Sequence, residues 1–211
     1  MTYKEFGDTT SGRLHTNLEG AVTDYTNNQF NKYKLAKLDL EAVDNLAQYV
    51  EELDLEWKDS TFGENYEVDK KTRDCQLAWI NDPNVTGYMF ENIKTANQDP
   101  DWQFDITQME EVQYTKYKPG GHYSMHNDSI MTTAHPRMVR KLSCSLVLND
   151  DFEGGEFQFM SLSSGMQTAK DLDLRKGDIL VFPSIQDHRV KPVTSGERRV
   201  LVGWTWGPLF K

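Results

Sequence analysis

The stretch "HRVKPVTSGERRVLVGWTW", residues 188–206, contains two apolar segments that each predict a β-strand, with a turn at Gly196 between them. In a simple hairpin His188 would lie opposite Trp204. Arg198 would then be roughly 20 Å from His188, at ~3.3 Å per residue. If His188 and Arg198 serve one site, the two strands must lie in facing sheets instead, as they can across the ~10 Å interior of a jelly roll.

Helical patterns precede the strands along the chain. Asp39 can cap a helix, and a second helix is predicted over 84–97. Six apolar residues fall on one face of the first helix: Leu40, Val43, Leu46, Ala47, Val50 and Leu53. Strands are predicted at 110–117, with Val112, Tyr114 and Lys116 on one face, and at 142–149, 156–159, 177–183, 188–193 and 198–206. This order predicts an α+β fold with a β-sandwich or small barrel as its C-terminal body.

Composition narrows the class of protein. The chain has 211 residues, which we interpret as a single domain (1–211) with a polar N-terminal extension at 1–34 and a charged loop at 58–74. The net charge of −10 disfavours a broad nucleic-acid surface. Two cysteines suit a reducing compartment, and no signal segment or run of 18 apolar residues is present. We expect a cytoplasmic protein with no membrane partner.

His126 and Asp128 are two residues apart in "GGHYSMHNDS", residues 120–129. On an extended segment such residues share a face, so a ring nitrogen and a carboxylate oxygen can reach one point. His188 is the candidate third ligand. Two histidines and one carboxylate form the ligand set of non-haem Fe(II) oxygenases, and a zinc hydrolase can use similar ligands.

Arg198, ten residues after His188, favours the first of these two possibilities. An oxygenase that uses 2-oxoglutarate must hold the free carboxylate at the far end of this cosubstrate. The planar guanidinium of arginine pairs bidentately with a carboxylate and stays charged. A zinc hydrolase has no such requirement.

The motifs "WQFDITQMEEVQYTKYKPGGHYSMHNDS", "LSCSLVLNDDFEGGEFQF", "GDILVFPS" and "HRVKPVTSGERRVLVGW" follow one another between about 100 and 206. In order and spacing this region resembles the prolyl 4-hydroxylase family of Fe(II)/2-oxoglutarate dioxygenases, in particular its bacterial and phage PKHD-type members. The resemblance implies a double-stranded β-helix (jelly-roll) catalytic core at about 100–206, with the N-terminal helices packed on one sheet.

The resemblance also implies roles for individual residues. His126, Asp128 and His188 would bind iron, and Arg198 would bind the distal carboxylate of 2-oxoglutarate. Tyr117 matches the family tyrosine that helps to position the cosubstrate, and Tyr123 stands where relatives often carry an aromatic residue beside the site. Ascorbate is a candidate reductant.

The chain departs from the family pattern at several places. Many animal and plant prolyl hydroxylases have lysine where this chain has Arg198, and the tyrosine that some relatives carry is absent from "SCSLVLN". Residues 1–34 and 58–74 have no counterpart in the resemblance. Since those segments would shape the substrate channel, the role of each, the identity of the substrate, the hydroxylated carbon, its stereochemistry and the oligomeric state are not predicted.

Other polar residues near these motifs have plainer interpretations. His122 and His135 are expected in loops, and Arg137, Arg140 and Lys141 as a solvated basic cluster that can also contact a substrate. Three further residues are expected to pack as core or rim side chains, Cys144, Trp204 and Trp206. Gly120 and Gly121 are expected to form the turn that aims the His-x-Asp segment.

The function implied is hydroxylation of a C–H bond with 2-oxoglutarate converted to succinate and carbon dioxide. Asp128 favours hydroxylation over halogenation, because a halogenase of this architecture leaves that position free for halide. The expected partner is a peptide or protein that carries the prolyl residue to be hydroxylated. The alternatives are a hydroxylase of a free amino acid or another side chain, and a non-catalytic metal-binding β-sandwich that serves as an interaction module.

Overall fold

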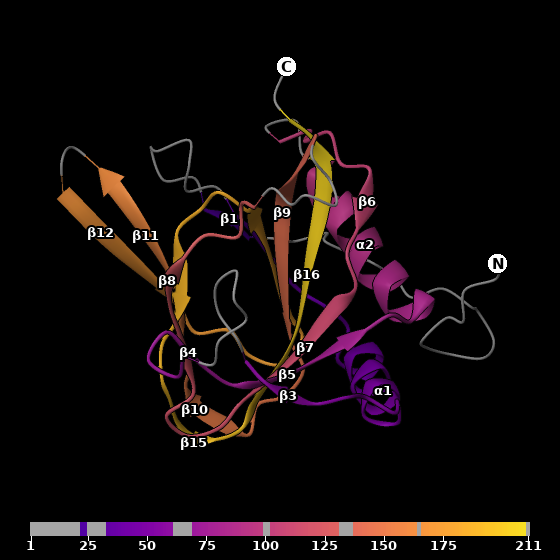
Figure 1. Cartoon of the computed structure of the whole chain (residues 1–211), viewed down its shortest axis with the longest axis vertical. Coiled ribbons are helices and arrows are strands. Elements are labelled where there is room, and N and C mark those ends of the chain that lie inside the picture. The colour runs from indigo at the N-terminus through magenta and orange to yellow at the C-terminus, as the bar shows by residue number, and fades with distance from the viewer. Residues whose placement is uncertain are drawn as a thin grey trace.

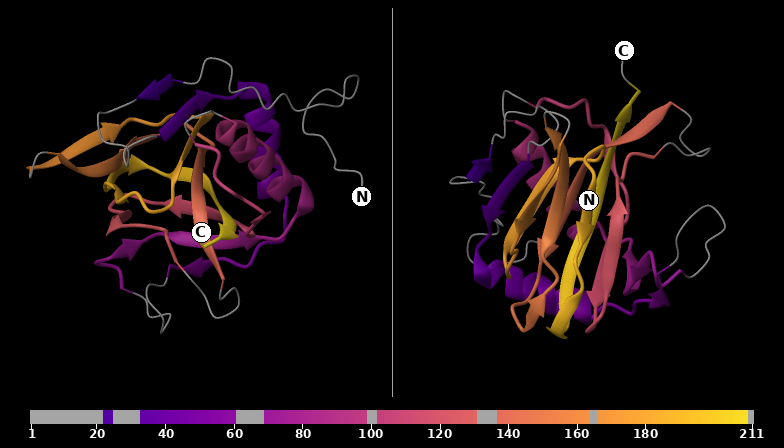
Figure 2. Two further views of the ribbon diagram at one scale, coloured as in Figure 1. Left: turned by 90° about the horizontal axis from the view of Figure 1, so that it is seen from above. Right: turned by 90° about the vertical axis from the view of Figure 1, so that its left-hand side faces the viewer.

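Two facing antiparallel sheets, a separate two-stranded pair and two helices form the regular structure of the described part of the chain (Figure 1). The computed structural model describes residues 22–24, 33–60, 69–98, 102–130, 137–163 and 166–209. Both helices lie on the outer face of the larger sheet, and the smaller sheet covers its inner face (Figure 2). Within the described residues, neither helix combines the length and the apolar character needed to cross a bilayer.

The larger sheet has the order β1-β2-β13-β9-β16-β7-β5-β3, and β6 pairs with β16. Its strands are β1 (Val22–Asp24), β2 (Tyr33–Lys37), β3 (Lys58–Asp59), β5 (Gln76–Ile80), β6 (Gln108–Met109), β7 (Val112–Tyr117), β9 (Met138–Val147), β13 (Asp178–Pro183) and β16 (Arg198–Pro208). The smaller sheet has the order β12-β11-β14-β8-β4. Its strands are β4 (Arg73–Asp74), β8 (His122–His126), β11 (Phe157–Ser163), β12 (Met166–Leu172) and β14 (His188–Val190). A separate pair joins β10 (Phe152–Gly154) to β15 (Val193–Gly196).

Both predicted helices are confirmed. The helix α1 (Leu40–Glu51) begins where Asp39 accepts a hydrogen bond from the backbone N–H of Ala42, at 2.9 Å. The helix α2 (Pro83–Asn97) has a proline as its first residue and Asp82 as its N-cap. A carboxylate cap satisfies amide groups that the first turn of a helix leaves without a partner, which explains both starting points.

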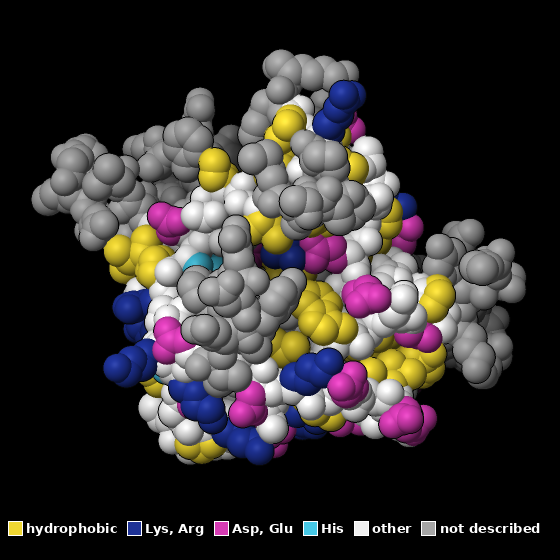
Figure 3. All heavy atoms as spheres, viewed as in Figure 1, with side chains coloured by type: hydrophobic (Ala, Val, Ile, Leu, Met, Phe, Trp, Pro, Cys, Tyr) yellow, Lys and Arg dark blue, Asp and Glu magenta, His cyan; other side chains and the backbone are white. Residues whose placement is uncertain are grey.

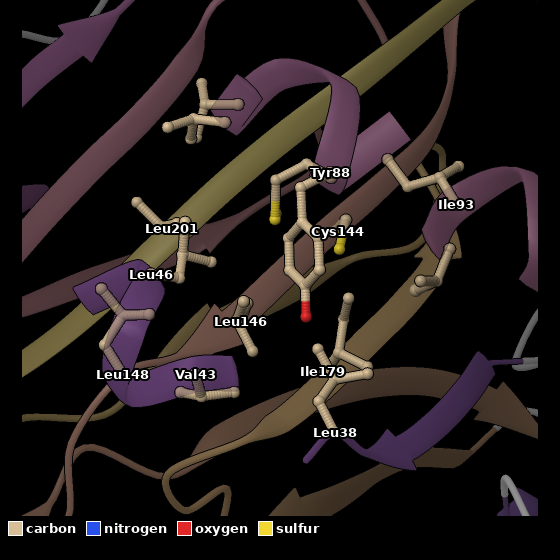
Figure 4. Packing of buried hydrophobic residues seen from close by; sticks show 14 of the residues in the cluster. Leu38, Val43, Leu46, Tyr88, Ile93, Cys144, Leu146, Leu148, Ile179 and Leu201 are labelled. Carbon is tan, nitrogen blue, oxygen red and sulfur yellow. The ribbon is translucent and has the colours of Figure 1, made fainter. Parts of the chain in front are cut away.

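A hydrophobic core lies between these helices and the larger sheet (Figure 4). On α1, Val43, Leu46 and Val50 are fully buried, as the periodicity predicts. The prediction was wrong for Leu40, which is 47% exposed because the first helical residue lies at the end of the packed face. A second core lies between the two sheets and includes Phe157, Phe159 and Phe182.

The strand predicted over 110–117 differs from expectation. Val112 and Tyr114 face the helices, but Gln113, Thr115 and Tyr117 are buried too, on the inner face. Both faces of β7 are covered because this strand is central in the larger sheet, with β5 on one side and β16 on the other. Burial on both faces removes the alternation on which the prediction depended.

Residues 188–206 form two strands in facing sheets, as a common site for His188 and Arg198 requires. β14 belongs to the smaller sheet and β16 to the larger one. The single strand predicted at 188–193 is wrong, since the chain leaves the ladder after Val190 and pairs again as β15. Gly196 ends β15 with a φ of +72°, and a Cβ there would lie 2.0 Å from the carbonyl oxygen of Asp151. Only glycine permits this change of sheet without displacing the backbone.

Several strands lie outside the segments predicted as strands, among them β2, β5, β8 and β12. The charged loop 58–74 also begins and ends in short strands, β3 and β4, while its residues 61–68 lie outside the described residues. Of the polar extension 1–34, residues 22–24 pair with β2 and the remainder before Tyr33 lies outside the described residues.

Two leucines of α1 provide a test of this packing. We expect Leu46→Ala to lower the free energy of unfolding by about 2–5 kcal/mol, because the fully buried side chain leaves a cavity between helix and sheet. Leu40→Ala, at an exposed position of the same helix, should change it by less than about 0.5 kcal/mol. Urea unfolding measures both, and equal losses would contradict the assigned helix face.

Candidate metal centre and its cavity

The pairing of β8 with β14 places two histidines side by side. His126, at the end of β8, lies directly opposite His188, at the start of β14, and their ring centroids are 4.2 Å apart. The chain then turns so that the backbone N–H of Asp128 donates to the carbonyl oxygen of Ser184, at 2.8 Å. This contact brings the carboxylate beside both rings.

The three side chains form a compact group. Asp128 Oδ1 is 3.5 Å from Nε2 of His126, and its Oδ2 is 3.6 Å from Nε2 of His188. One potential ligand atom from each residue lies within 4.8 Å of the other two, and the residues are buried or nearly so. Two nitrogens and one carboxylate oxygen on one side leave the opposite side free, so this group could hold a divalent metal with open coordination positions.

The backbone selects the ring nitrogen that each histidine presents. Nδ1 of His126 lies 2.7 Å from the carbonyl oxygen of Ser124, and Nδ1 of His188 lies 2.9 Å from that of Gln186. A carbonyl can only accept, so we assign the proton to Nδ1 in both rings. Nε2 is therefore the unprotonated nitrogen, and it points toward Asp128, as a metal ligand requires.

The protonation states also suit a metal. Burial lowers the pKa of His188 to about 4, so the ring is neutral at pH 7. Ser143 Oγ donates to Asp128 Oδ2 at 2.7 Å and lies 3.0 Å from Ser184 Oγ. These contacts fix the orientation of an ionised carboxylate.

Arg198 lies across the cavity on β16, with 1% of its surface exposed. Burial lowers the pKa of its guanidinium to about 10, which still leaves the group charged at pH 7. Its Nε and Nη2 atoms are buried and have no hydrogen-bond partner among the described residues. These two atoms form the edge that pairs bidentately with a carboxylate, so Arg198 fits an anionic group that enters the cavity.

The cavity that joins these groups lies between the two sheets. Its walls include inward-facing side chains of both sheets: Arg73, Gln113, Tyr117, Tyr123, His126, Asp128, Cys144, Ser145, Phe157, Phe182, His188, Val190, Arg198, Val200, Val202 and Trp204. All five site residues named from the sequence line this one space. The strands therefore bring together the predicted ligands and the predicted carboxylate-binding arginine.

Two tyrosines support the charged groups. Tyr117 is 2% exposed and pairs with Arg198 in the β7–β16 ladder, where its ring centroid is 5.8 Å from the guanidinium carbon. Burial raises the pKa of its hydroxyl, so this group is a neutral hydrogen-bond donor. Tyr123 stacks on His126 with ring centroids 3.6 Å apart. Its stacking restrains the orientation of that imidazole.

Sequence reasoning missed Arg73 and Gln113. Arg73 is only 9% exposed, although it belongs to the segment 58–74 that was predicted to be a charged loop. No local signal distinguishes a buried arginine from a solvated one. Strand geometry places the side chain of Gln113 on the face of β7 away from Tyr114, but nothing in the sequence marks that face as buried.

The basic cluster expected after residue 136 does not form. Arg140 donates to both carboxylate oxygens of Glu110 at 2.6 Å and packs over Trp204, while Lys141 is 6% exposed. Arg140 and Lys141 are therefore not solvated charges, because Arg140 is paired with Glu110 and the side chain of Lys141 is buried. His122 lies on β8 rather than in a loop, and His135 lies outside the described residues.

The remaining minor predictions agree with the structure. Cys144, Trp204 and Trp206 are buried, at 0%, 6% and 3% exposure. Gly120 adopts a φ of +87°, which favours glycine, and its N–H donates to the carbonyl oxygen of Val193 at 2.8 Å. The turn before β8 is thus tied to β15.

The comparisons with known proteins agree with this geometry. The sequence profile of the 2OG-Fe(II) oxygenase superfamily matches residues 112–206. A PKHD-type hydroxylase of Colwellia psychrerythraea is 41% identical over 87 residues, which are 40% of this chain and 37% of that protein. A PKHD-type hydroxylase of Aliarcobacter butzleri is 32% identical over 156 residues, 70% of this chain and 66% of that protein. The chain thus matches less than two thirds of the length of either relative.

A solved structure resembles the fold. A prolyl-4-hydroxylase of Pseudomonas putida aligns with a TM-score of 0.61 at 24% identity, over 82% of this chain and 91% of that one. This likeness confirms the predicted jelly-roll core with helices on one sheet. The sequence matches lead to one assignment: residues 112–206 belong to the 2OG-Fe(II) oxygenase superfamily, and the sequence relatives of the chain are PKHD-type hydroxylases.

Proposed function

We propose that the protein is a 2-oxoglutarate- and Fe(II)-dependent hydroxylase whose iron is held by His126, Asp128 and His188. The observation that carries this proposal is the convergence of those three side chains opposite the buried, unpartnered edge of Arg198. We assign Arg198 to the distal carboxylate of 2-oxoglutarate. When bound, iron with 2-oxoglutarate supplies the activation of dioxygen and the oxidation of a C–H bond.

The residues of the chain orient and isolate the reactants. The two backbone carbonyls keep Nε2 of each histidine available, and Ser143 fixes the carboxylate of Asp128. Arg198 anchors the cosubstrate at the end remote from the metal, with the Tyr117 hydroxyl as a neutral donor beside it. Phe157, Phe182 and the valines of β16 form apolar walls that exclude water.

We further propose a prolyl residue of a peptide or protein as the substrate. The names of the sequence relatives and the fold likeness to a prolyl hydroxylase support this choice. Exposed apolar side chains stand within three residues of the proposed ligands, namely Met125, Ile130 and Ile185. Figure 3 displays apolar side chains near the centre of one face, with both acidic and basic groups around them. An extended chain could rest on such a surface.

Asp128→Ala tests the metal assignment. We expect it to abolish succinate formation from 2-oxoglutarate and to remove the rise in melting temperature that Mn²⁺ gives the wild-type protein, because one ligand is lost. Asp44→Ala, an exposed carboxylate on α1, is the matched control and should keep both properties. Tight metal binding without any 2-oxoglutarate turnover in the wild-type protein would favour the non-catalytic binding module.

Arg198→Gln tests the cosubstrate assignment. We expect the KM for 2-oxoglutarate to rise about 10- to 100-fold, since charge-assisted hydrogen bonds contribute about 1.5–3 kcal/mol. Arg199→Gln is the control, because Arg199 points to Glu51 on the helix side of the same strand. Steady-state kinetics measure both variants, and an equal rise in the two would refute the role of Arg198.

A further inference from the structure

A second buried guanidinium, that of Arg73, lines the same cavity. The Nη2 atom of Arg73 donates to Gln113 Oε1 at 2.5 Å, and the central guanidinium carbon, Cζ, lies 4.5 Å from the ring centroid of Tyr123. Its Nε is buried and has no hydrogen-bond partner among the described residues. Thr115 also donates to Gln113 Oε1, at 3.2 Å, so the oxygen that holds Arg73 is itself held in place.

The charges around the cavity do not balance without a further anion. Among the lining residues, Asp128 is the acidic group, and Arg73 and Arg198 are the basic ones. Fe²⁺ and the two carboxylates of 2-oxoglutarate would cancel each other, and Asp128 would offset Arg198. The charge of Arg73 would remain. The titratable groups that interact with its guanidinium are the thiol of Cys75 and the hydroxyls of Tyr117 and Tyr123, and no carboxylate of the described residues is among them. A buried charge without a partner is costly, so a ligand that supplies the opposite charge is favoured.

The location of Arg73 separates it from the cosubstrate anchor. Arg73 pairs with Tyr123 across the β4–β8 ladder in the smaller sheet, the sheet that carries His126 and His188. The Tyr123 ring stacks on His126, so one aromatic ring lies between the guanidinium and a proposed metal ligand. Arg198 stands on the other sheet, which the guanidinium of Arg73 also reaches through Gln113 of β7. Each guanidinium keeps N–H groups that have no acceptor among the described residues, so the two arginines can bind two anions.

We propose that Arg73 binds a carboxylate of the substrate, so that the preferred substrate carries this group close to the carbon that is hydroxylated. The inference rests on the proposed function and specifies its substrate class. The carboxylate can belong to the hydroxylated residue itself, as in a C-terminal proline, or to an acidic side chain beside it. The same chemistry serves both, and the experiment distinguishes them.

Three peptides of one sequence provide the test: one ends in proline with a free carboxylate, one ends in proline amide, and one is the amide with aspartate before the proline. Oxygen gain is followed by mass spectrometry to give kcat/KM for each. We expect the wild-type protein to prefer one of the two acids over the plain amide by about 10- to 100-fold, from the strength of charge-assisted hydrogen bonds. The acid that is preferred identifies the source of the carboxylate.

Arg73→Gln should lower kcat/KM for the preferred acid to near the value for the amide. Arg73→Lys should restore only part of the preference, because lysine keeps the charge but lacks the fork that engages Gln113 and the ligand together. Arg199→Gln, on the outer face of the larger sheet, should keep the preference in full. Melting curves establish that each variant is folded.

Calorimetry with the Mn²⁺- and 2-oxoglutarate-loaded protein separates this inference from the proposed function. Tighter binding of the acid than of the amide, lost in Arg73→Gln, supports the role of Arg73 even if no peptide gains oxygen. Equal binding of acids and amide by the wild-type protein would overturn it, as would an Arg73→Gln variant that raises only the KM for 2-oxoglutarate. Glu64 and Glu67 lie outside the described residues. If their joint replacement by glutamine created the acid preference, the chain itself would neutralise Arg73 and the inference would fail.

Discussion

The ladder position that sets His126 opposite His188 is the constraint on which the site depends. Side chains in a strand alternate between faces, so a slip of one residue in this pairing would turn one imidazole to the outside. The register is held by the neighbouring pair of β14 with β11, where Phe159 lies opposite His188. Phe157 and Phe182 pack on the ring of His188. The apolar core between the sheets thus specifies where the polar group stands.

The same core accounts for the charged groups that it encloses. An isolated charge in an apolar interior is costly, and each buried charge here has a specific arrangement around it. The carboxylate of Asp128 accepts a hydrogen bond from Ser143 and lies beside two histidines, whereas Arg198 lies near two aromatic rings and has two donor atoms without a partner among the described residues. The carboxylate thus accepts a hydrogen bond from within the protein, whereas two nitrogens of the guanidinium have no acceptor among the described residues. That difference is expected if Asp128 binds a metal ion together with the two histidines and Arg198 binds an anion that enters from solution.

Several of these features could be predicted from the sequence because their signals are local. The cap Asp39 at the start of α1 and the buried face of α1 follow from capping and periodicity. The separation of β14 from β16 followed from a chain-length argument on His188 and Arg198. The strands that were missed or misjudged have causes that are not local. β7 has no alternation because both its faces are covered, and β14 ends early because the chain changes partner at β15. Arg73 and Arg140 looked like solvated charges, since only the fold brings Gln113 and Glu110 to them.

The positions of these residues in the sheets differ between the proposed metal and cosubstrate site and the proposed substrate contact. The proposed metal ligands and Arg198 lie on or directly beside strands that have neighbours on both sides, β8, β14 and β16. Arg73 lies on β4, a strand of two residues at the edge of the smaller sheet and at the end of the segment 58–74. Strands with two neighbours tolerate few changes in geometry, whereas an edge strand can vary without disturbing the ladder. A family that shares one metal chemistry can therefore differ in substrate through residues at this edge. Segment 58–74, which supplies Arg73, lies outside the residues 112–206 that match the superfamily profile, in agreement with that view.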